Sequence, residues 1–319
     1  MSSRASIGTS WHISTVVGVF SATAAAARLL RLDAEQTANA FGIAAMQSCG
    51  TLELAYGVGS DLRGLYAGFS TKGAVLAALL AQKGVTGTRS MFEGKAGLFN
   101  VYFGGKYDRE KMLAGFGREF SGGDLLYKPW PSCGASHGFI HATIELMREH
   151  RIAPEDIEAL RVNVGDFQWQ LCQPLESRRA PVKPADAKFS IPFCVAVAAT
   201  YGAVKVANFF GDGLRDPKVL AMAQEVTPVR DESFDWKMKL PKGRLDVVTR
   251  DGRTISGIGD PVPGDVECPM TWEYIEAKFR DCAAPAANQP QADAVLRAQA
   301  LLRGLKDVAD VTAVLRELA

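Results

Sequence analysis

One short segment of this sequence combines a lysine, two prolines, small polar residues and a histidine. From Lys128 to His137 it reads Lys-Pro-Trp-Pro-Ser-Cys-Gly-Ala-Ser-His, so a proline-rich stretch leads directly into a helix predicted to begin near Ser136. The first amides of a helix attract anions, and Lys128 adds a full positive charge beside them. The pattern predicts an anion-binding site. The alternative is a tight interdomain turn capped by Ser132 or Ser136.

A histidine also stands directly before the first apolar stretch of the chain. Gly8-Thr-Ser-Trp-His12 leads into the alanine-rich stretch from Val16 to Leu30, which is predicted to be a buried helix. A neutral imidazole at this place can act as a general base or hydrogen-bond a carboxylate. The alternative is a histidine that only caps the helix or packs in the core.

The remaining reactive residues form weaker patterns. Cys133 adjoins the predicted helix start and Lys128, which would lower a thiol pKa, but the sequence places no base or orienting residue nearby. His137 and His141 are spaced for one helix face, without a third metal ligand. The glycine pairs form neither GxGxxG nor a P-loop. We therefore expect neither a metal nor a nucleotide cofactor.

Composition and charge narrow the class of protein. The 319 residues are 47% hydrophobic and 22% charged, which is typical of a globular protein with a sizeable core. A net charge of +1 provides no overall field for nucleic acid or anionic lipid. Six cysteines without CxxC indicate a reduced, cytoplasmic protein. Polar residues interrupt the apolar run after Arg4, so we expect neither signal-peptide cleavage nor a membrane span.

The elements that must position these residues change in character along the chain. Up to about Gly122 the sequence is helical, and Asp33 followed by Gln36 is a variant of the capping box. Alternation then predicts an α+β part with an antiparallel sheet, including a hairpin closed by a primed turn at Asp251-Gly252. Helices follow from Thr271 onward. Helices are expected at 16–30, 34–47, 67–83, 137–149, 193–206 and 292–318, and strands at 160–164, 245–249 and 254–256.

The order of several short motifs is specific. They are Gly8-Thr-Ser-Trp-His12, Leu32-Asp-Ala-Glu-Gln36 with Ala40-Phe-Gly-Ile-Ala44, Leu65-Tyr-Ala-Gly68 with Lys83-Gly-Val-Thr-Gly87, Lys128-Pro-Trp-Pro-Ser-Cys133 with His137, Ala187-Lys-Phe-Ser-Ile-Pro-Phe193 and, more weakly, Pro269-Met-Thr-Trp272. Over essentially the whole chain they resemble the MmgE/PrpD family, which includes 2-methylcitrate dehydratase, cis-aconitate decarboxylase and iminodisuccinate epimerase.

The resemblance implies both a fold and a reaction class. The fold would be α plus α+β, with a discontinuous all-helical domain built from residues 1–123 and 261–319. An α+β lid domain, residues 124–260, would be inserted, and the site would lie in the cleft between the two domains. The function would be that of a cofactor-independent lyase, a hydro-lyase similar to 2-methylcitrate dehydratase, that abstracts a proton next to a carboxylate of a small di- or tricarboxylate.

The resemblance also gives roles to single residues. Lys128 would bind a substrate carboxylate and stabilise developing negative charge, Arg63 would be the second carboxylate clamp, and His12 would be the catalytic acid or base. The residues expected to line the anion pocket are Ser132, Cys133 and Ser190.

The chain departs from the family pattern at several points. Arg63 stands where the family usually has lysine, Tyr66 where it has histidine, and Phe193 where it has tyrosine. The sequence also begins after a helical segment that family chains usually carry. The alternative function is therefore a non-catalytic or half-site subunit of a split enzyme, or an epimerase or decarboxylase of the same family. The expected partners are a small carboxylate substrate and either a second copy in a homodimer or a chain that supplies the missing helices.

Overall fold

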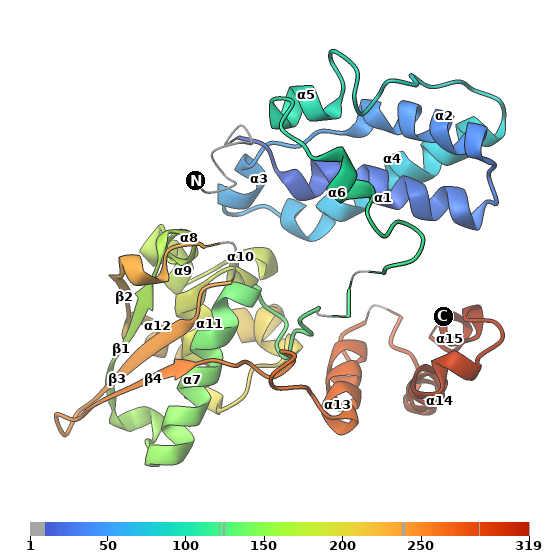
Figure 1. Cartoon of the computed structure of the whole chain (residues 1–319). Coiled ribbons are helices and arrows are strands. Elements are labelled where there is room, and N and C mark those ends of the chain that lie inside the picture. The colour runs from blue at the N-terminus through green and yellow to red at the C-terminus, as the bar shows by residue number, and fades with distance from the viewer. Residues whose placement is uncertain (1–9, 121, 124, 238–239, 287, 319) are drawn as a thin grey trace. The chain divides into compact units, whose positions relative to one another are not determined.

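The computed structural model describes residues 10–120, 122–123, 125–237, 240–286 and 288–318. Contacts divide the chain into two units, Met1–Phe120 and Ser121–Ala319 (Figure 1). Helices and one small four-stranded sheet make up the described structure, which agrees with the predicted α plus α+β class. The inserted lid and the boundaries at 123 and 260 stay predictions. Gly8 and Thr9 of the motif before His12 lie outside the described residues.

The first unit is built around three helices that pack against one another, α1, α2 and α4 (Figure 1). Its core contains Val16, Val19 and Phe20 of α1. The predicted capping box is confirmed, because Asp33 Oδ1 accepts the Gln36 N–H at 2.8 Å and Gln36 Oε1 accepts the Asp33 N–H at 3.1 Å. The helices of this unit are α1 Ile13–Leu29, α2 Ala34–Ala44, α3 Glu53–Tyr56, α4 Leu62–Gln82, α5 Leu98–Phe103 and α6 Arg109–Leu113.

The second unit contains a sheet with the strand order β2-β1-β3-β4. Its strands are β1 Ile157–Val164, β2 Val226–Arg230, β3 Gly243–Thr249 and β4 Thr254–Gly259. The predicted antiparallel sheet is wrong in one respect, because β2 pairs parallel with β1, with Leu160 opposite Val226. The predicted hairpin of β3 and β4 is confirmed, but its turn is not of the primed kind. Gly252 donates to Thr249 O at 2.8 Å, and of the turn residues only Gly252, at φ 87°, has a positive φ.

Helices cover one face of this sheet. The longest, α7, contacts β3 and β4, and α11 packs between α7 and α12. The helices before the final segment are α7 Gly134–His150, α8 Asp166–Gln170, α9 Leu175–Arg179, α10 Pro184–Lys188, α11 Ile191–Tyr201 and α12 Pro217–Gln224. Where α7 crosses β3 and β4, the backbone of the helix is in direct contact with the backbones of the two strands. A Cβ added at Gly138 would lie 2.6 Å from Gly243 N, and one added at Gly259 would lie 1.9 Å from Gly138 O.

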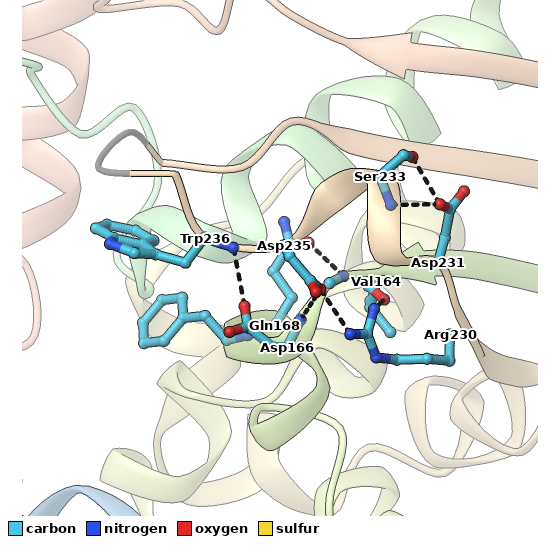
Figure 2. A network of polar contacts seen from close by, with 10 residues as sticks. Val164, Asp166, Gln168, Arg230, Asp231, Ser233, Asp235 and Trp236 are labelled. Carbon is cyan, nitrogen blue, oxygen red and sulfur yellow. Dashed lines mark hydrogen bonds and ion pairs between the residues drawn. The ribbon is translucent and has the colours of Figure 1, made fainter. Parts of the chain in front are cut away.

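A polar network holds the segment between β2 and β3 at the end of β1 (Figure 2). Asp235 Oδ1 accepts the Asp166 N–H at 2.9 Å and pairs with the Arg230 guanidinium at 2.6 Å. Asp166 in turn accepts the Trp236 N–H at 2.9 Å, and Gln168 Nε2 donates to two carbonyls just before β3 at 3.3 and 3.1 Å. Backbone polar groups of a long connection are thus satisfied by side chains of α8 and of the connection itself.

The C-terminal segment carries α13 Trp272–Ala283, α14 Ala292–Arg303 and α15 Thr312–Glu317. The predicted start at Thr271 is confirmed, since its hydroxyl accepts the Tyr274 N–H at 3.3 Å as an N-cap. The single helix predicted over 292–318 is wrong, because it is interrupted after Arg303. Asp281 of α13 accepts the Val206 N–H at 2.9 Å, which ties this helix to the rest of its unit.

One described helix, α4, is long and apolar enough to cross a membrane by length and composition. This is weak evidence for a span, because core helices of globular proteins meet the same criterion. Here α4 packs against α1 and α2.

The close crossing of α7 and the sheet predicts that an alanine in place of Gly138 destabilises the protein. A glycine-to-alanine change inside a helix ordinarily adds up to about 1 kcal/mol of stability. At Gly138 we expect a loss on the order of 1–3 kcal/mol instead, because the new methyl group meets the backbone of Gly243. Urea unfolding of Gly138→Ala would measure it. As a control, Gly68→Ala, on α4 with no atom within 4 Å of the new Cβ, should be neutral or stabilising. A Gly138→Ala variant as stable as the wild type would contradict the prediction.

Candidate functional site

His12 lies at the N-cap of α1 in the first unit. Its backbone N–H donates to Gly50 O at 3.0 Å, and its carbonyl accepts the Thr15 hydroxyl at 2.8 Å. The half-buried ring packs edge-on against Tyr66 with centroids 4.8 Å apart. Nδ1 is buried and has no hydrogen-bond partner among the described residues. The main chain therefore fixes the residue, while Nδ1 of its imidazole makes no hydrogen bond within the described ranges.

Arg63 is the charged neighbour of this imidazole. It lies in the first turn of α4 and is half-buried. Burial and then the Arg63 charge lower the pKa of His12 below its ordinary value of 6.5. The imidazole is consequently neutral at neutral pH, which is the form that can accept a proton. The structure thus brings two of the predicted site residues together, a base and a cation.

The Lys128–Cys133 turn carries the predicted site residues of the second unit. Lys128 is exposed, and its ammonium donates to Ser132 O at 3.1 Å. Trp130 is buried, and the Cys133 N–H donates to Lys188 O at 2.8 Å. The turn is therefore held by carbonyl oxygens, and the cation of Lys128 stays at the start of α7.

The helix after this turn begins at Gly134, two positions before the predicted start at Ser136. Cys133 is its N-cap, with no side-chain cap bond, so the alternative of a cap by Ser132 or Ser136 is wrong. The two serine hydroxyls are buried and bond to each other at 2.8 Å, and Ser136 also donates to Cys133 O at 2.7 Å. Ser132 and Cys133 thus lie at the helix start as expected, but the Ser132 hydroxyl is used internally.

Ser190 lies in the interior of the second unit, at the start of α11. It is completely buried, its hydroxyl accepts the Phe193 N–H at 3.0 Å as the N-cap of α11, and it donates to Arg178 O. Both functions of the hydroxyl are therefore used inside the protein, and contact of Ser190 with a substrate stays a prediction.

Two residues near Lys128 were not assigned to the site from the sequence. Lys278 of α13 donates its ammonium to Lys128 O. His137, in the first turn of α7, is only 4% exposed, packs edge-on against Trp130, and has a buried Nε2 with no partner in the described part of the chain. Burial, followed by the charges of Lys128 and Lys278, lowers the pKa of His137 to about 4. The spacing of Lys128 and His137 was visible in the sequence, but nothing there connects Lys278 to them.

The cysteines and acidic residues give little support to other chemistry. Burial raises the pKa of the thiols of Cys172 and Cys194 to about 12, so both are poor nucleophiles. Within the described ranges no group of three or more histidine, cysteine, aspartate or glutamate side chains is arranged to hold a metal ion.

The predicted site residues therefore fall into two sets. His12 and Arg63 belong to the first unit, and the second contains Lys128, Ser132, Cys133 and Ser190. Their convergence on one substrate stays a prediction.

Comparison with protein-family models matches both parts of the chain. Residues 1–110 match the MmgE/PrpD N-terminal domain, and residues 130–303 match the MmgE/PrpD C-terminal domain. The chain belongs to the MmgE/PrpD family. The predicted resemblance is thus confirmed. The second match contains the segment Trp130–His137 and begins two positions after Lys128.

Relatives of known name are cis-aconitate decarboxylases. The enzyme of Aspergillus terreus strain NIH 2624 is 27% identical over 322 residues, which cover 97% of this chain and 64% of the relative. The human cis-aconitate decarboxylase is 22% identical over 311 residues, which cover 96% of this chain and 63% of the relative. This chain therefore spans just under two thirds of the length of these relatives, which are carboxy-lyases of the same family.

The neighbourhood of His12 predicts a pKa change in one variant. Removing the positive charge in Arg63→Gln should raise the pKa of His12 towards 6.5, because one of the two causes of its lowering is lost. Histidine NMR titration would measure it. Lys72→Gln, a change on the same helix whose charge is not among those causes, should leave the His12 pKa where it is. An unaltered His12 pKa in Arg63→Gln would show that the two groups are electrostatically independent.

Burial of His137 predicts a pH dependence of stability. Its pKa is about 4 in the folded protein against an ordinary 6.5, so the unfolded chain binds the proton first as the pH falls. The free energy of unfolding should therefore have its full value above about pH 6.5 and decrease towards pH 4, by up to about 3 kcal/mol from this group.

Urea unfolding across this pH range would measure the effect in wild type, His137→Phe and, as a control, His150→Phe at the exposed end of the same helix. The His137→Phe variant should show a flatter dependence, and the control should keep that of the wild type. Equal slopes in all three proteins would rule the assignment out.

Proposed function

We propose that this chain acts as a lyase on a small di- or tricarboxylate. The observation that carries the proposal is the His12 imidazole, whose buried Nδ1 has no hydrogen-bond partner in the described ranges and whose pKa is lowered by burial and by the charge of Arg63, a cation suited to a carboxylate. Membership of a family whose matched relatives are lyases supports the same reaction class. Lys128 supplies the second cation from the start of α7.

The proposed chemistry follows from the charges involved. In a dehydration, His12 takes a proton from the carbon next to a carboxylate, the bond from the neighbouring carbon to its hydroxyl breaks, and the protonated His12 returns the proton to the leaving hydroxide, which departs as water. In a decarboxylation, the bond from the carbon to one carboxylate breaks, carbon dioxide leaves, and the carbon receives a proton that His12 delivers from water, with hydroxide released to solvent. Either path builds negative charge on or beside carboxylates, and Arg63 and Lys128 stabilise that charge through fixed cationic donors.

The two lyase reactions have different support. The family resemblance favours dehydration of a substrate similar to 2-methylcitrate. The matched relatives are named for decarboxylation of cis-aconitate. We therefore take cis-aconitate and 2-methylcitrate as the two test substrates. The cytoplasmic location expected from the cysteine usage is part of the proposal.

A second candidate function is that of a half-site subunit. It is supported by the large apolar side chains that α4 exposes, with Leu65 at 58% and Phe69 at 57%. A partner, either a second copy or a chain that supplies further helices, would cover such a surface.

The proposal is tested by turnover of the full chain. Carbon dioxide release from cis-aconitate and water loss from 2-methylcitrate would be measured for wild type and Lys128→Met. We expect a fall in kcat/KM of at least about 100-fold in the variant, because a fixed cation at the developing charge is removed. Thermal stability should be unchanged, since the side chain is exposed.

Lys306→Met, an exposed lysine of the same unit, is the control and should retain activity. Equal turnover by wild type and Lys128→Met would place the site elsewhere. A wild-type chain that is inert alone but active when mixed with a family chain that supplies the additional length would favour the half-site function.

A further inference from the structure

Two ammonium groups meet at one turn of the second unit. Lys128 donates to Ser132 O at 3.1 Å, and Lys278 of α13 donates to Lys128 O from 150 positions further along the chain. Each lysine ammonium has three N–H donors, and each uses one of them on a carbonyl of this turn. The contacts fix where the two cations lie and leave further donors on both.

Carboxylates do not neutralise this pair. Among the described residues, neither ammonium has a carboxylate within the 4.0 Å of an ion pair, whereas cations on exposed helices, such as those of Lys111 and Arg297, have one. Burial lowers the pKa of the half-buried Lys278, Cys282 raises it, and the Lys128 charge lowers it by a smaller amount. Asp281 lies one turn along α13, but its Oδ2 accepts the Val206 N–H. The turn therefore holds repelling positive charges, which an anion would stabilise.

A buried polar atom without a partner in the described ranges lies in the same place. His137 is 4% exposed, its Nε2 makes no hydrogen bond there, and the charges of both lysines act on its ring. His137 also belongs to the first turn of α7, a helix of 17 residues whose N-cap makes no side-chain bond. The two lysines and the helix start favour an anionic group here, and the unpartnered Nε2 of the neutral imidazole can accept a hydrogen bond from a donor of the same ligand.

There is room for a ligand on the α13 side of the turn. Lys278 lines a cavity of about 390 Å³ together with the rings of Trp130 and Tyr274 and the charged side chains of Lys205, Glu145 and Asp281. Lys128 is not among its lining residues, so the cavity offers space beside Lys278 alone. This volume is within the range of small-molecule sites.

We propose that Lys278 is the second cation of the Lys128 site, and that the two lysines together bind a ligand with more than one carboxylate. The inference rests on the proposed function, because the ligand is taken to be a small polycarboxylate. It adds a residue of α13 to the substrate-binding set and explains within one unit how two carboxylates are held.

The test is binding of propane-1,2,3-tricarboxylate, which has no hydroxyl group or double bond and so undergoes neither lyase reaction. Calorimetry on the full chain would compare wild type, Lys278→Gln, Lys278→Arg and the control Lys306→Gln. We expect the Kd to rise about 10-fold or more in Lys278→Gln, to stay within about 3-fold in Lys278→Arg and to be unaltered in the control, because the positive charge is the required feature. Acetate, with one carboxylate, should show a smaller difference between wild type and Lys278→Gln.

The comparison of the two Lys278 variants separates binding from support of the turn. Glutamine keeps a donor for Lys128 O but has no charge, and arginine keeps both. Equal loss in both variants, or wild-type affinity in Lys278→Gln, would overturn the inference, as would a wild-type chain that does not bind the tricarboxylate. The proposed lyase function is judged separately by turnover of cis-aconitate and 2-methylcitrate. Turnover with unaltered KM in Lys278→Gln would leave that function standing while removing Lys278 from the site.

Discussion

The turn from Lys128 to Cys133 holds its cations with neutral carbonyl oxygens instead of carboxylates. Ser132 O accepts the Lys128 ammonium, Lys128 O accepts the Lys278 ammonium, and Lys188 O accepts the Cys133 N–H. A carbonyl fixes an ammonium without cancelling its charge, so the full attraction for an anion is kept. The anion site proposed for the second unit depends on this arrangement. A carboxylate in place of Ser132 O or Lys128 O would give an internal ion pair and a weaker anion site.

The first unit contains the residue proposed as the base, His12. The main-chain contacts of His12 fix its backbone at the N-cap of α1, while burial and Arg63 keep its imidazole neutral. In both units, then, main-chain atoms position a proposed site residue, His12 in one and the Lys128 ammonium in the other. This division suits a reaction in which negative charge forms next to carboxylates and must be met by charges that are already in place.

Features that depend on residues close together in the sequence could be predicted from it, and features that depend on distant residues could not. The capping box of Asp33 and Gln36 and the N-cap at Thr271 depend on residues three positions apart, and both are present. Strand β2 was missed because it is short, contains Pro228 and pairs at the edge of the sheet through a long crossover. The start of α4 was placed too late because Gly64 and Gly68 weaken its helical pattern. Lys278 could not be found at all, since only the fold brings α13 to a turn 150 positions earlier.

The backbone crossing at Gly138, Gly243 and Gly259 has a consequence for how the protein can change over generations. No side-chain rotamer separates α7 from β3 and β4 at that point, so the helix start sits at a distance set by main-chain atoms alone. Side chains that line the neighbouring cavity, such as Tyr274, can be exchanged without moving this crossing. Sequences that diverge in this unit should therefore retain all three glycines while such lining residues change, so that α7 keeps its place on the sheet.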